Sequence, residues 1–274
     1  MANLNGLAFI HLELTSRCNK GDGTPGSGCW MCGRRKIERD YPHLAVWGDM
    51  EWPLFKHIAH QIPPGITVQL HNNGEPTLYP QLGEAISYFK GRNITSFNTN
   101  GKLLVEKADE IIGNLDTLCI SVVQNDSEDN EQYKSVRKFL EMKGTKKPFM
   151  VYRLLGWIEK RQRWKELPGI IANRVLHAPG GSYDYEKEVT KPEIGICWDL
   201  LTHLAIDRHG NASICVRFDP HGYGIIRNVK DFTLEQLWNH RVRKTTIQAH
   251  LKGRRDLCPL CKTCDYWGCP QGGD

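Results

Sequence analysis

LELTSRCNKGDGTPGSGCWMCGRR, residues 12–35, holds three of the chain's ten cysteines. Cys18, Cys29 and Cys32 follow directly after the apolar, strand-like run of residues 7–14. The ten residues between Cys18 and Cys29 are almost all Gly, Ser, Thr, Pro, Asn, Asp or Lys, which favours a loop. Three thiols without a nearby fourth are typical of a metal centre that keeps an open coordination position. The segment therefore predicts a metal-binding loop, residues 18–32, which we call the Cys loop.

The composition is that of an ordinary globular protein. The 274 residues are 40% hydrophobic and 24% charged, enough for one large α/β domain with a small appendage. The first residues lack the basic region of a signal peptide, and no run approaches the roughly 18 apolar residues that span a bilayer. We therefore expect a cytoplasmic protein that has no membrane partner. The net charge of +5 lies largely in short basic runs, which are usually solvated surface.

The cysteines fall into two groups. A disulfide framework is not expected, because the cytosol keeps thiols reduced, so metal binding is the economical explanation. Cys119 stands alone within a predicted strand and is expected to be a small buried apolar residue. Beyond the Cys loop, the remaining six crowd the end of the chain: Cys197, Cys215, Cys258, Cys261, Cys264 and Cys269. The spacing predicts two metal sites in two parts of the chain.

Strand and helix patterns alternate over about 150 residues. Predicted strands cover residues 7–14, 66–70, 94–97, 118–123 and 149–155, and predicted helices cover 51–62, 82–89, 103–112 and 131–142. Such alternation predicts an α/β fold with a parallel sheet and right-handed crossovers. Five or six strands are too few for an eight-unit barrel, so we expect a partial (β/α)6-type TIM barrel.

Polar segments follow several of these strands. They are the Cys loop, NGEP at residues 73–76, NTNG at residues 98–101, and the segment 121–125. Because the chemistry of parallel sheets gathers at the C-terminal strand ends, we expect these segments to converge on one mouth.

The later part of the chain has a different character. Residues 1–165 are the predicted core, residues 166–194 have little periodicity and are interpreted as a linker or substrate loop, and residues 195–274 form a cysteine-rich subdomain. Within the subdomain we predict a β-hairpin, from residues 201–206 and 212–216, and a helix at 233–243. Its last part has too little apolar material to fold without a metal.

These motifs resemble the radical S-adenosylmethionine (radical SAM) enzymes, whose cluster loop is usually C-x3-C-x2-C. The spacing from Cys29 to Cys32, with Met31 before and Arg34 after the last cysteine, matches that pattern. Ten residues separate Cys18 from Cys29 instead of three, so residues 19–28 look like an insertion. The resemblance implies a SAM-binding [4Fe-4S] cluster on these three cysteines.

The strand-end motifs extend the resemblance. Residues 73–76 resemble the family's G-G-E-P segment, which holds the methionine amino group of SAM, and residues 98–101 resemble its T-N-G turn. Ser121 and Arg137 resemble a strand-end serine and a following arginine that would address the ribose and the carboxylate. The implied SAM-binding residues are Asn73, Gly74, Glu75, Pro76, Asn98, Ser121 and Arg137, with Glu75 also placed among the catalytic residues beside Cys18, Cys29 and Cys32.

The end of the chain resembles the SPASM/twitch auxiliary-cluster subdomain. Twelve residues separate Cys197 from Gly210, four more precede Cys215, and Cys258 and Cys261 form a C-x2-C pair. The resemblance implies a second [4Fe-4S] cluster on these four cysteines, closer to the single-cluster twitch form. Cys264 and Cys269 depart from both known forms.

The function implied by the resemblance is reductive cleavage of SAM to a 5′-deoxyadenosyl radical that abstracts hydrogen from substrate. A reductase such as flavodoxin or ferredoxin would supply the electron. We expect a small polar molecule or modified nucleotide as substrate, and oxidation, isomerisation or epimerisation as the reaction. A peptide is less favoured because no peptide-recognition domain precedes the first strand.

Two alternatives remain open. Modification of a base in DNA or RNA is motivated by the basic runs, Trp157 and Trp164. The non-enzymatic alternative is a zinc-stabilised nucleic-acid-binding or interaction protein. In it, a zinc ion would be held by the Cys loop with a remote ligand such as His43, and a zinc ribbon would be formed by the last cysteines.

Overall fold

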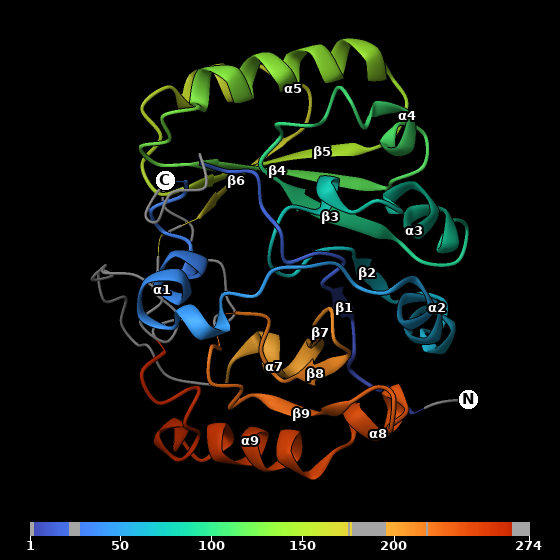
Figure 1. Cartoon of the computed structure of the whole chain (residues 1–274), viewed down its shortest axis with the longest axis vertical. Helices are drawn as coiled ribbons and strands as arrows, with labels where there is room; N and C mark the ends of the chain where they lie inside the picture. The colour runs from blue at the N-terminus through green and yellow to red at the C-terminus, as the bar shows by residue number, and fades with distance from the viewer. Residues whose placement is uncertain (1–2, 22–27, 175, 177–195, 218, 265–274) are drawn as a thin grey trace.

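The computed structural model describes residues 3–21, 28–174, 176, 196–217 and 219–264. In this part of the chain one sheet of nine strands has the order β6-β5-β4-β3-β2-β1-β7-β8-β9 (Figure 1). The strands are β1 (Phe9–Leu12), β2 (Thr67–Gln69), β3 (Thr95–Thr99), β4 (Thr117–Val123), β5 (Phe149–Leu155), β6 (Ile170–Arg174), β7 (His203–Ile206), β8 (Asn211–Ser213) and β9 (Ile225–Asn228).

Strands β1 to β6 are parallel and are joined by helical crossovers, which confirms the predicted α/β partial (β/α)6 barrel. Helices α2 to α5 lie along one side of the sheet, and α1 lies on the other side of the molecule (Figure 1). The bounds are α1 (Gly33–Asp40), η1 (Pro42–Leu44), α2 (Trp52–Gln61), η2 (Pro76–Leu78), α3 (Leu82–Tyr88), α4 (Ala108–Ile111), α5 (Asp129–Lys143) and α6 (Arg161–Lys165).

Two local predictions before residue 195 are wrong. The helix expected at 103–112 is reduced to α4. Before it, Gly101 lies at φ +79° and its carbonyl oxygen accepts a hydrogen bond from Ser135 Oγ at 2.8 Å. Turns follow Gly101, so the helix begins late. Residues 170–174, expected within a linker, form β6, paired in parallel with β5. As an outer strand with no fully buried residue, β6 lacks the apolar alternation that a sequence prediction needs. Residues 177–194 of the expected linker lie outside the described residues.

The C-terminal part continues the same sheet. The expected hairpin is present as β7 and β8, and β7 also pairs in parallel with β1, from Phe9↔His203 to Leu12↔Ile206. The helix expected at 233–243 is two helices, α8 (Leu234–Trp238) and α9 (Arg241–Leu251), because His240 leaves the helical conformation and caps α9. The remaining helices are α7 (Trp198–Thr202) and η4 (Arg255–Leu257).

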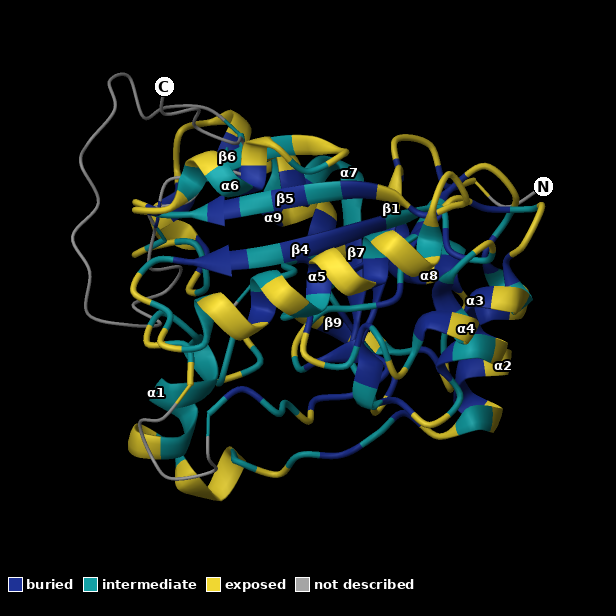
Figure 2. Ribbon diagram, turned by 90° about the horizontal axis from the view of Figure 1, so that it is seen from above, coloured by how far each residue is buried: buried dark blue, intermediate teal, exposed yellow. Residues whose placement is uncertain are grey.

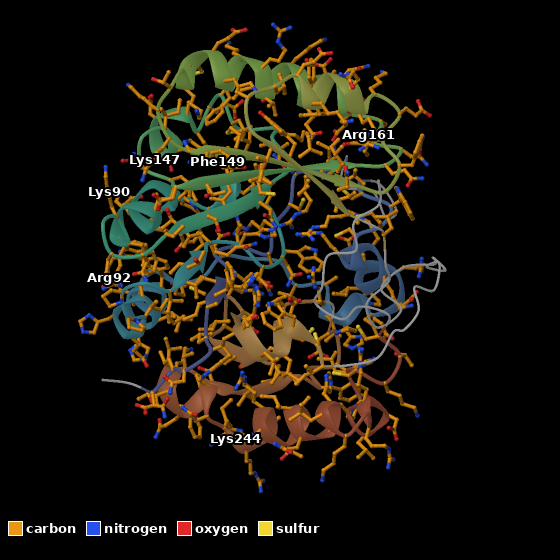
Figure 3. The ribbon with its side chains drawn as sticks, turned by 180° about the vertical axis from the view of Figure 1, so that it is seen from behind. Lys90, Arg92, Lys147, Phe149, Arg161 and Lys244 are labelled. Carbon is orange, nitrogen blue, oxygen red and sulfur yellow. The ribbon has the colours of Figure 1, made fainter. Side chains whose placement is uncertain are left out.

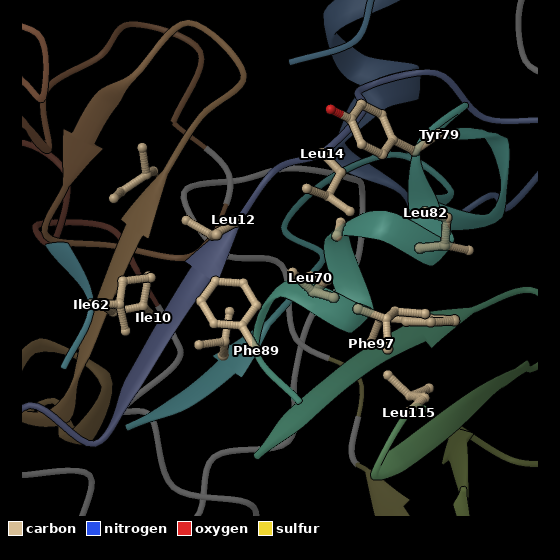
Figure 4. Packing of buried hydrophobic residues seen from close by; sticks show 14 of the residues in the cluster. Ile10, Leu12, Leu14, Ile62, Leu70, Tyr79, Leu82, Phe89, Phe97 and Leu115 are labelled. Carbon is tan, nitrogen blue, oxygen red and sulfur yellow. The ribbon is translucent and has the colours of Figure 1, made fainter. Parts of the chain in front are cut away.

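The two faces of the parallel sheet differ in character. The face packed against the helices is apolar, and Ile10 and Phe97 are fully buried there (Figure 4), as is Leu118. Strands β4 and β5 are largely buried, whereas the outward side of α5 is exposed (Figure 2). Because strand side chains alternate, residues between these apolar positions, such as His11 and Arg153, belong to the opposite face. Within the described residues, none of the helices has the length and apolar character that crossing a lipid bilayer requires.

Candidate functional site

The Cys loop ends in a tight turn that brings two of its thiols together. The Cys32 amide donates to the Cys29 carbonyl oxygen at 3.0 Å, and α1 begins directly after Cys32. The pKa of the Cys29 thiol is raised to about 12, mainly by burial and also by the nearby Cys32 and Cys18. Because Cys29 feels the charges of Cys18 and Cys32, and Cys18 that of Cys32, the three thiols lie in one electrostatic neighbourhood.

A single metal ion and an iron–sulfur cluster place different demands on the spacing of their ligands. Among the described residues, no group of three or more His, Cys, Asp or Glu is arranged to hold one metal ion. A cluster binds each thiolate to a different iron, so its ligands stand farther apart than those of a single zinc. His43, the alternative zinc ligand, is exposed on η1. The three thiols would lose their protons on binding a metal.

A buried ion cluster fastens the described ends of the insertion to the loop after β4. Lys20 Nζ lies 2.7 Å from both Asp126 Oδ2 and Glu128 Oε2, and the Lys20 side chain is only 4% exposed. At the other end, Trp30 Nε1 donates to the Gln124 carbonyl oxygen at 2.8 Å. Residues 22–27 of the insertion lie outside the described residues. The inserted loop is therefore anchored on both sides, which its glycine-rich sequence did not indicate.

Lys20→Met is expected to destabilise the protein by about 3 to 5 kcal/mol, because it leaves the Asp126 carboxylate buried without its partner. The matched control is Lys102→Met, since Lys102 pairs with the same Glu128 but is 34% exposed, and should cost less than about 1 kcal/mol. Urea unfolding of both variants checks this. Equal losses would show that the buried cluster is not the anchor.

Gly74 lets the segment 73–76 approach the base of the Cys loop. Its φ is +74°, and a Cβ there would stand 2.4 Å from the Thr15 carbonyl oxygen and 2.7 Å from that of Arg17. The next residue, Glu75, donates its backbone N–H to the Arg17 carbonyl oxygen at 2.7 Å. Only glycine fits this contact, so the NGEP segment and the Cys loop are held together by backbone.

Glu75 joins this segment to the next strand end. Its carboxylate is buried and accepts from the hydroxyls of Thr77 and Thr99, each at 2.7 Å, and from the Asn100 amide at 2.7 Å. Burial raises the pKa of Glu75, and these hydrogen bonds oppose the rise. The carboxylate therefore bridges residues 73–76 and 98–101. Pro76 opens η2 directly after it.

Further hydrogen bonds complete the convergence. Asn100 Nδ2 donates to Asn19 Oδ1 at 2.8 Å, and Gln132 Nε2 donates to the carbonyl oxygens of Asn100 and Ser121, both at 2.9 Å. The predicted gathering of the polar segments at one mouth is confirmed by these contacts. Gln132 was not singled out from the sequence, because a glutamine on a helix gives no signal of its own.

The other predicted SAM-binding residues differ in their placement. Asn73 Nδ2 donates to Glu13 Oε2 at 2.7 Å, and Glu13 is a buried carboxylate whose pKa burial raises. Asn98 lies on the polar face of β3, beside Cys119 of β4. Arg137 is exposed on α5, and the described part of the chain gives it no hydrogen bond or ion pair, so its position lends the carboxylate role no support. Cys119 is buried, as predicted.

The cysteines of the C-terminal part form a second group. Burial raises the pKa of Cys215, as do the nearby Cys264 and Cys197. Burial also raises the pKa of Cys261 to about 12, with further contributions from Cys258, Cys264 and Cys197. The Cys197 amide donates to Nδ1 of the buried His250 at 3.2 Å. Five thiols therefore gather here, including Cys264, while Cys269 lies outside the described residues.

Known proteins resemble this chain both in its C-terminal part and over nearly its whole length. Residues 197–265 match the SPASM family, described as an iron–sulfur cluster-binding domain. BtrN in complex with AdoMet and 2-DOIA is 16% identical, with a TM-score of 0.59 over 94% of this chain and 93% of that chain.

SuiB of Streptococcus suis was solved bound to S-adenosylmethionine and to its precursor peptide SuiA. The peptide-bound structure is 14% identical, with a TM-score of 0.64 over 94% of this chain and 71% of that chain. The SAM-bound structure is 13% identical, with a TM-score of 0.62 over 94% and 72%. No curated protein sequence matches the chain. The chain thus has the fold of BtrN and SuiB, a partial barrel followed by a segment that matches the SPASM iron–sulfur cluster-binding domain.

Proposed function

We propose that this chain is a radical SAM enzyme. It holds a [4Fe-4S] cluster on Cys18, Cys29 and Cys32, binds SAM across the strand ends, and abstracts hydrogen from a small polar molecule or modified nucleotide. The observation that carries the proposal is the hydrogen-bonded junction at Glu75, which joins the Cys loop, residues 73–76 and residues 98–101 at one mouth. The SAM-bound relatives with this fold support it.

The chain's own residues bind and position. Three thiolates would hold the cluster, and Asn98 and Ser121, at the ends of β3 and β4, would offer polar side chains for binding SAM. Glu75 keeps the strand-end backbone in place, because both of its oxygens already accept hydrogen bonds from neighbouring residues. When bound, the reduced cluster supplies the electron that splits SAM into methionine and the 5′-deoxyadenosyl radical.

We assign a second [4Fe-4S] cluster to Cys197, Cys215, Cys258 and Cys261. It would take an electron from the substrate in an oxidation, or orient the substrate in an isomerisation or epimerisation. The first cluster would receive its electron from a reductase such as flavodoxin or ferredoxin. The eight cysteines of the described residues from Cys18 to Cys261 are free thiols, which fits a cytoplasmic enzyme.

Several observations favour a small substrate over a polynucleotide. Trp164, one of the residues that motivated nucleic-acid binding, is fully buried beside Tyr152. Lys147, Arg161 and Lys244, each from a different basic run, lie at widely separated edges of the molecule (Figure 3). A polynucleotide needs one continuous basic track, so these runs are better explained as solvated surface. If the protein binds neither DNA nor RNA even at low salt, the nucleic-acid alternative is excluded.

The reaction itself gives a direct test. Anaerobically reconstituted protein should be brown, contain about eight iron per chain, and release equal amounts of 5′-deoxyadenosine and methionine from SAM under dithionite. The two products are expected to be equal because one bond cleavage yields both. Iron and amino-acid analysis with chromatography of the nucleosides measures this. A colourless, zinc-containing protein that leaves SAM intact would instead identify the zinc-stabilised alternative.

The substrate is found by isotope transfer. Candidate compounds deuterated at carbon are incubated with the reduced enzyme and SAM, and deuterium is measured in 5′-deoxyadenosine. A small polar compound or nucleotide is expected to transfer it. If only a peptide transfers deuterium, the substrate is a peptide instead. SuiB, for comparison, was solved bound to a precursor peptide.

A further inference from the structure

The polar face of the sheet carries three cationic or imidazole side chains that the proposed SAM site does not use. His11 lies between the buried Ile10 and Leu12 on β1, so its side chain projects to the opposite face. Arg153 lies in the same way between Tyr152 and Leu154 on β5. His71, directly after Leu70, projects to this face from the end of β2.

His11 is a neutral imidazole with an unused nitrogen. It is only 8% exposed, and its Nε2 is buried with no hydrogen-bond partner in the described part of the chain. Burial lowers the pKa of His11 well below its usual value, and His203, His71, Arg217 and Arg153 lower it further. A buried nitrogen without a partner costs free energy, so this position favours a ligand that supplies one.

His71 repeats the arrangement from the neighbouring strand. Its pKa is lowered to about 4, mainly by burial and also by the charge of Arg153. A backbone hydrogen bond with Gly74 opposes this lowering. Its Nδ1 is also buried without a hydrogen-bond partner among the described residues. The charge of Arg153 therefore acts on both imidazoles, and strand alternation puts all three side chains on the same face of the sheet.

His203, the neighbour of His11, is already engaged. The two rings have centroids 5.2 Å apart, but His203 Nδ1 lies 2.7 Å from Thr202 Oγ1 and 3.9 Å from Asp199 Oδ1. The other oxygen of Asp199 accepts from Arg217 at 3.1 Å. Asp199 therefore already contacts His203 and Arg217, and these contacts give His11 Nε2 no hydrogen-bond partner.

Arg153 has no anionic partner in the described part of the chain. Its neighbours in register are Ser121 on β4 and Ala172 on β6, and neither carries a charge. Two buried carboxylates of the strand ends already have hydrogen-bond donors, since Glu13 accepts from Asn73 and Glu75 accepts from Thr99 and Asn100. No described carboxylate therefore forms an ion pair with Arg153.

We propose that Arg153, His11 and His71 bind an anionic oxygen group, a carboxylate or a phosphate, on the small-molecule substrate. A guanidinium donates two parallel hydrogen bonds to such a group, and a neutral imidazole can donate a further N–H. The anion would satisfy the unused nitrogens and offset the charge of Arg153. The inference rests on the proposed function and narrows its substrate class to small anions.

The test uses the full chain loaded with its clusters and titrated with inorganic phosphate and, separately, with acetate. Saturable binding of one probe is expected, weakened at least tenfold in Arg153→Gln and in part restored in Arg153→Lys. Arg241→Gln, which removes an exposed arginine at the start of α9, should bind as the wild type does. The probe that binds identifies the group as phosphate or carboxylate.

Two results would overturn the inference. One is the absence of saturable binding, or binding that Arg153→Gln does not change. The other is an equal loss of SAM affinity in Arg153→Gln, because the guanidinium would then serve the carboxylate of SAM. Anion binding is measured by calorimetry and needs no SAM cleavage. The two proposals can therefore fail separately. A wild type that does not cleave SAM could still bind the anion, and one that binds no anion could still cleave SAM.

Discussion

Cys29→Ala is expected to reduce reductive SAM cleavage to less than about a thousandth of the wild-type rate, a barrier increase of ~4 kcal/mol. The turn that joins Cys29 to Cys32 supplies two of the three thiolates, and a methyl group cannot bind iron. Two thiolates alone would hold the cluster poorly, so the open iron that binds SAM would be lost. The measurement is 5′-deoxyadenosine formed from SAM under dithionite.

The control for this variant is Cys119→Ala. Cys119 is buried on β4 and belongs to neither group of thiols, so its removal should preserve cleavage at a modest cost in stability. Iron in Cys29→Ala should fall from about eight to about four per chain, because the SPASM domain keeps its own cluster. Undiminished cleavage in Cys29→Ala would refute the assignment of the Cys loop.

Gly74→Ala is expected to lose both stability and SAM cleavage. The positive φ costs an alanine about 1 to 2 kcal/mol, and the added Cβ would press on the backbone of Thr15 and Arg17. Because backbone cannot move aside as a side chain does, we expect a total loss of about 3 to 5 kcal/mol. Thermal unfolding and SAM cleavage measure the two effects.

Gly65→Ala separates the strain from the clash. Gly65 has a similar φ of +88°, but nothing lies within 4 Å of the position of an added Cβ. This variant should therefore show only the cost of the backbone conformation, about 1 to 2 kcal/mol, with cleavage unchanged. Equal destabilisation of the two variants would show that the contact between Gly74 and the Cys loop is not required.

The sequence was sufficient for the features that depend on local pattern. The five predicted strands and the hairpin after residue 200 were found because alternation and turn residues mark them. The strand β6 was missed because an outer strand has half-exposed residues on both faces. The polar segments could be expected to converge because parallel strands bring their ends to one edge.

The contacts that hold the site together could not be predicted in the same way. Lys20 meets Asp126 across 106 residues of sequence, and neither residue carries a local signal of the pairing. Glu75 was chosen by resemblance, but its partners Thr99 and Asn100 appear only once β2 and β3 lie side by side. Arg137 was chosen by the same resemblance, and its exposure on α5 shows that order along the chain does not settle which way a helix faces.

The parallel pairing of β7 with β1 means that the SPASM domain is not a detachable module. Along one of its two edges, over four residue pairs, the first strand of the barrel is paired with the C-terminal part. A chain truncated before Cys197 would leave β1 unpaired along that side, with apolar residues such as Leu204 no longer covering it. Such an uncovered strand readily pairs with a second molecule, so the barrel alone would be prone to aggregate.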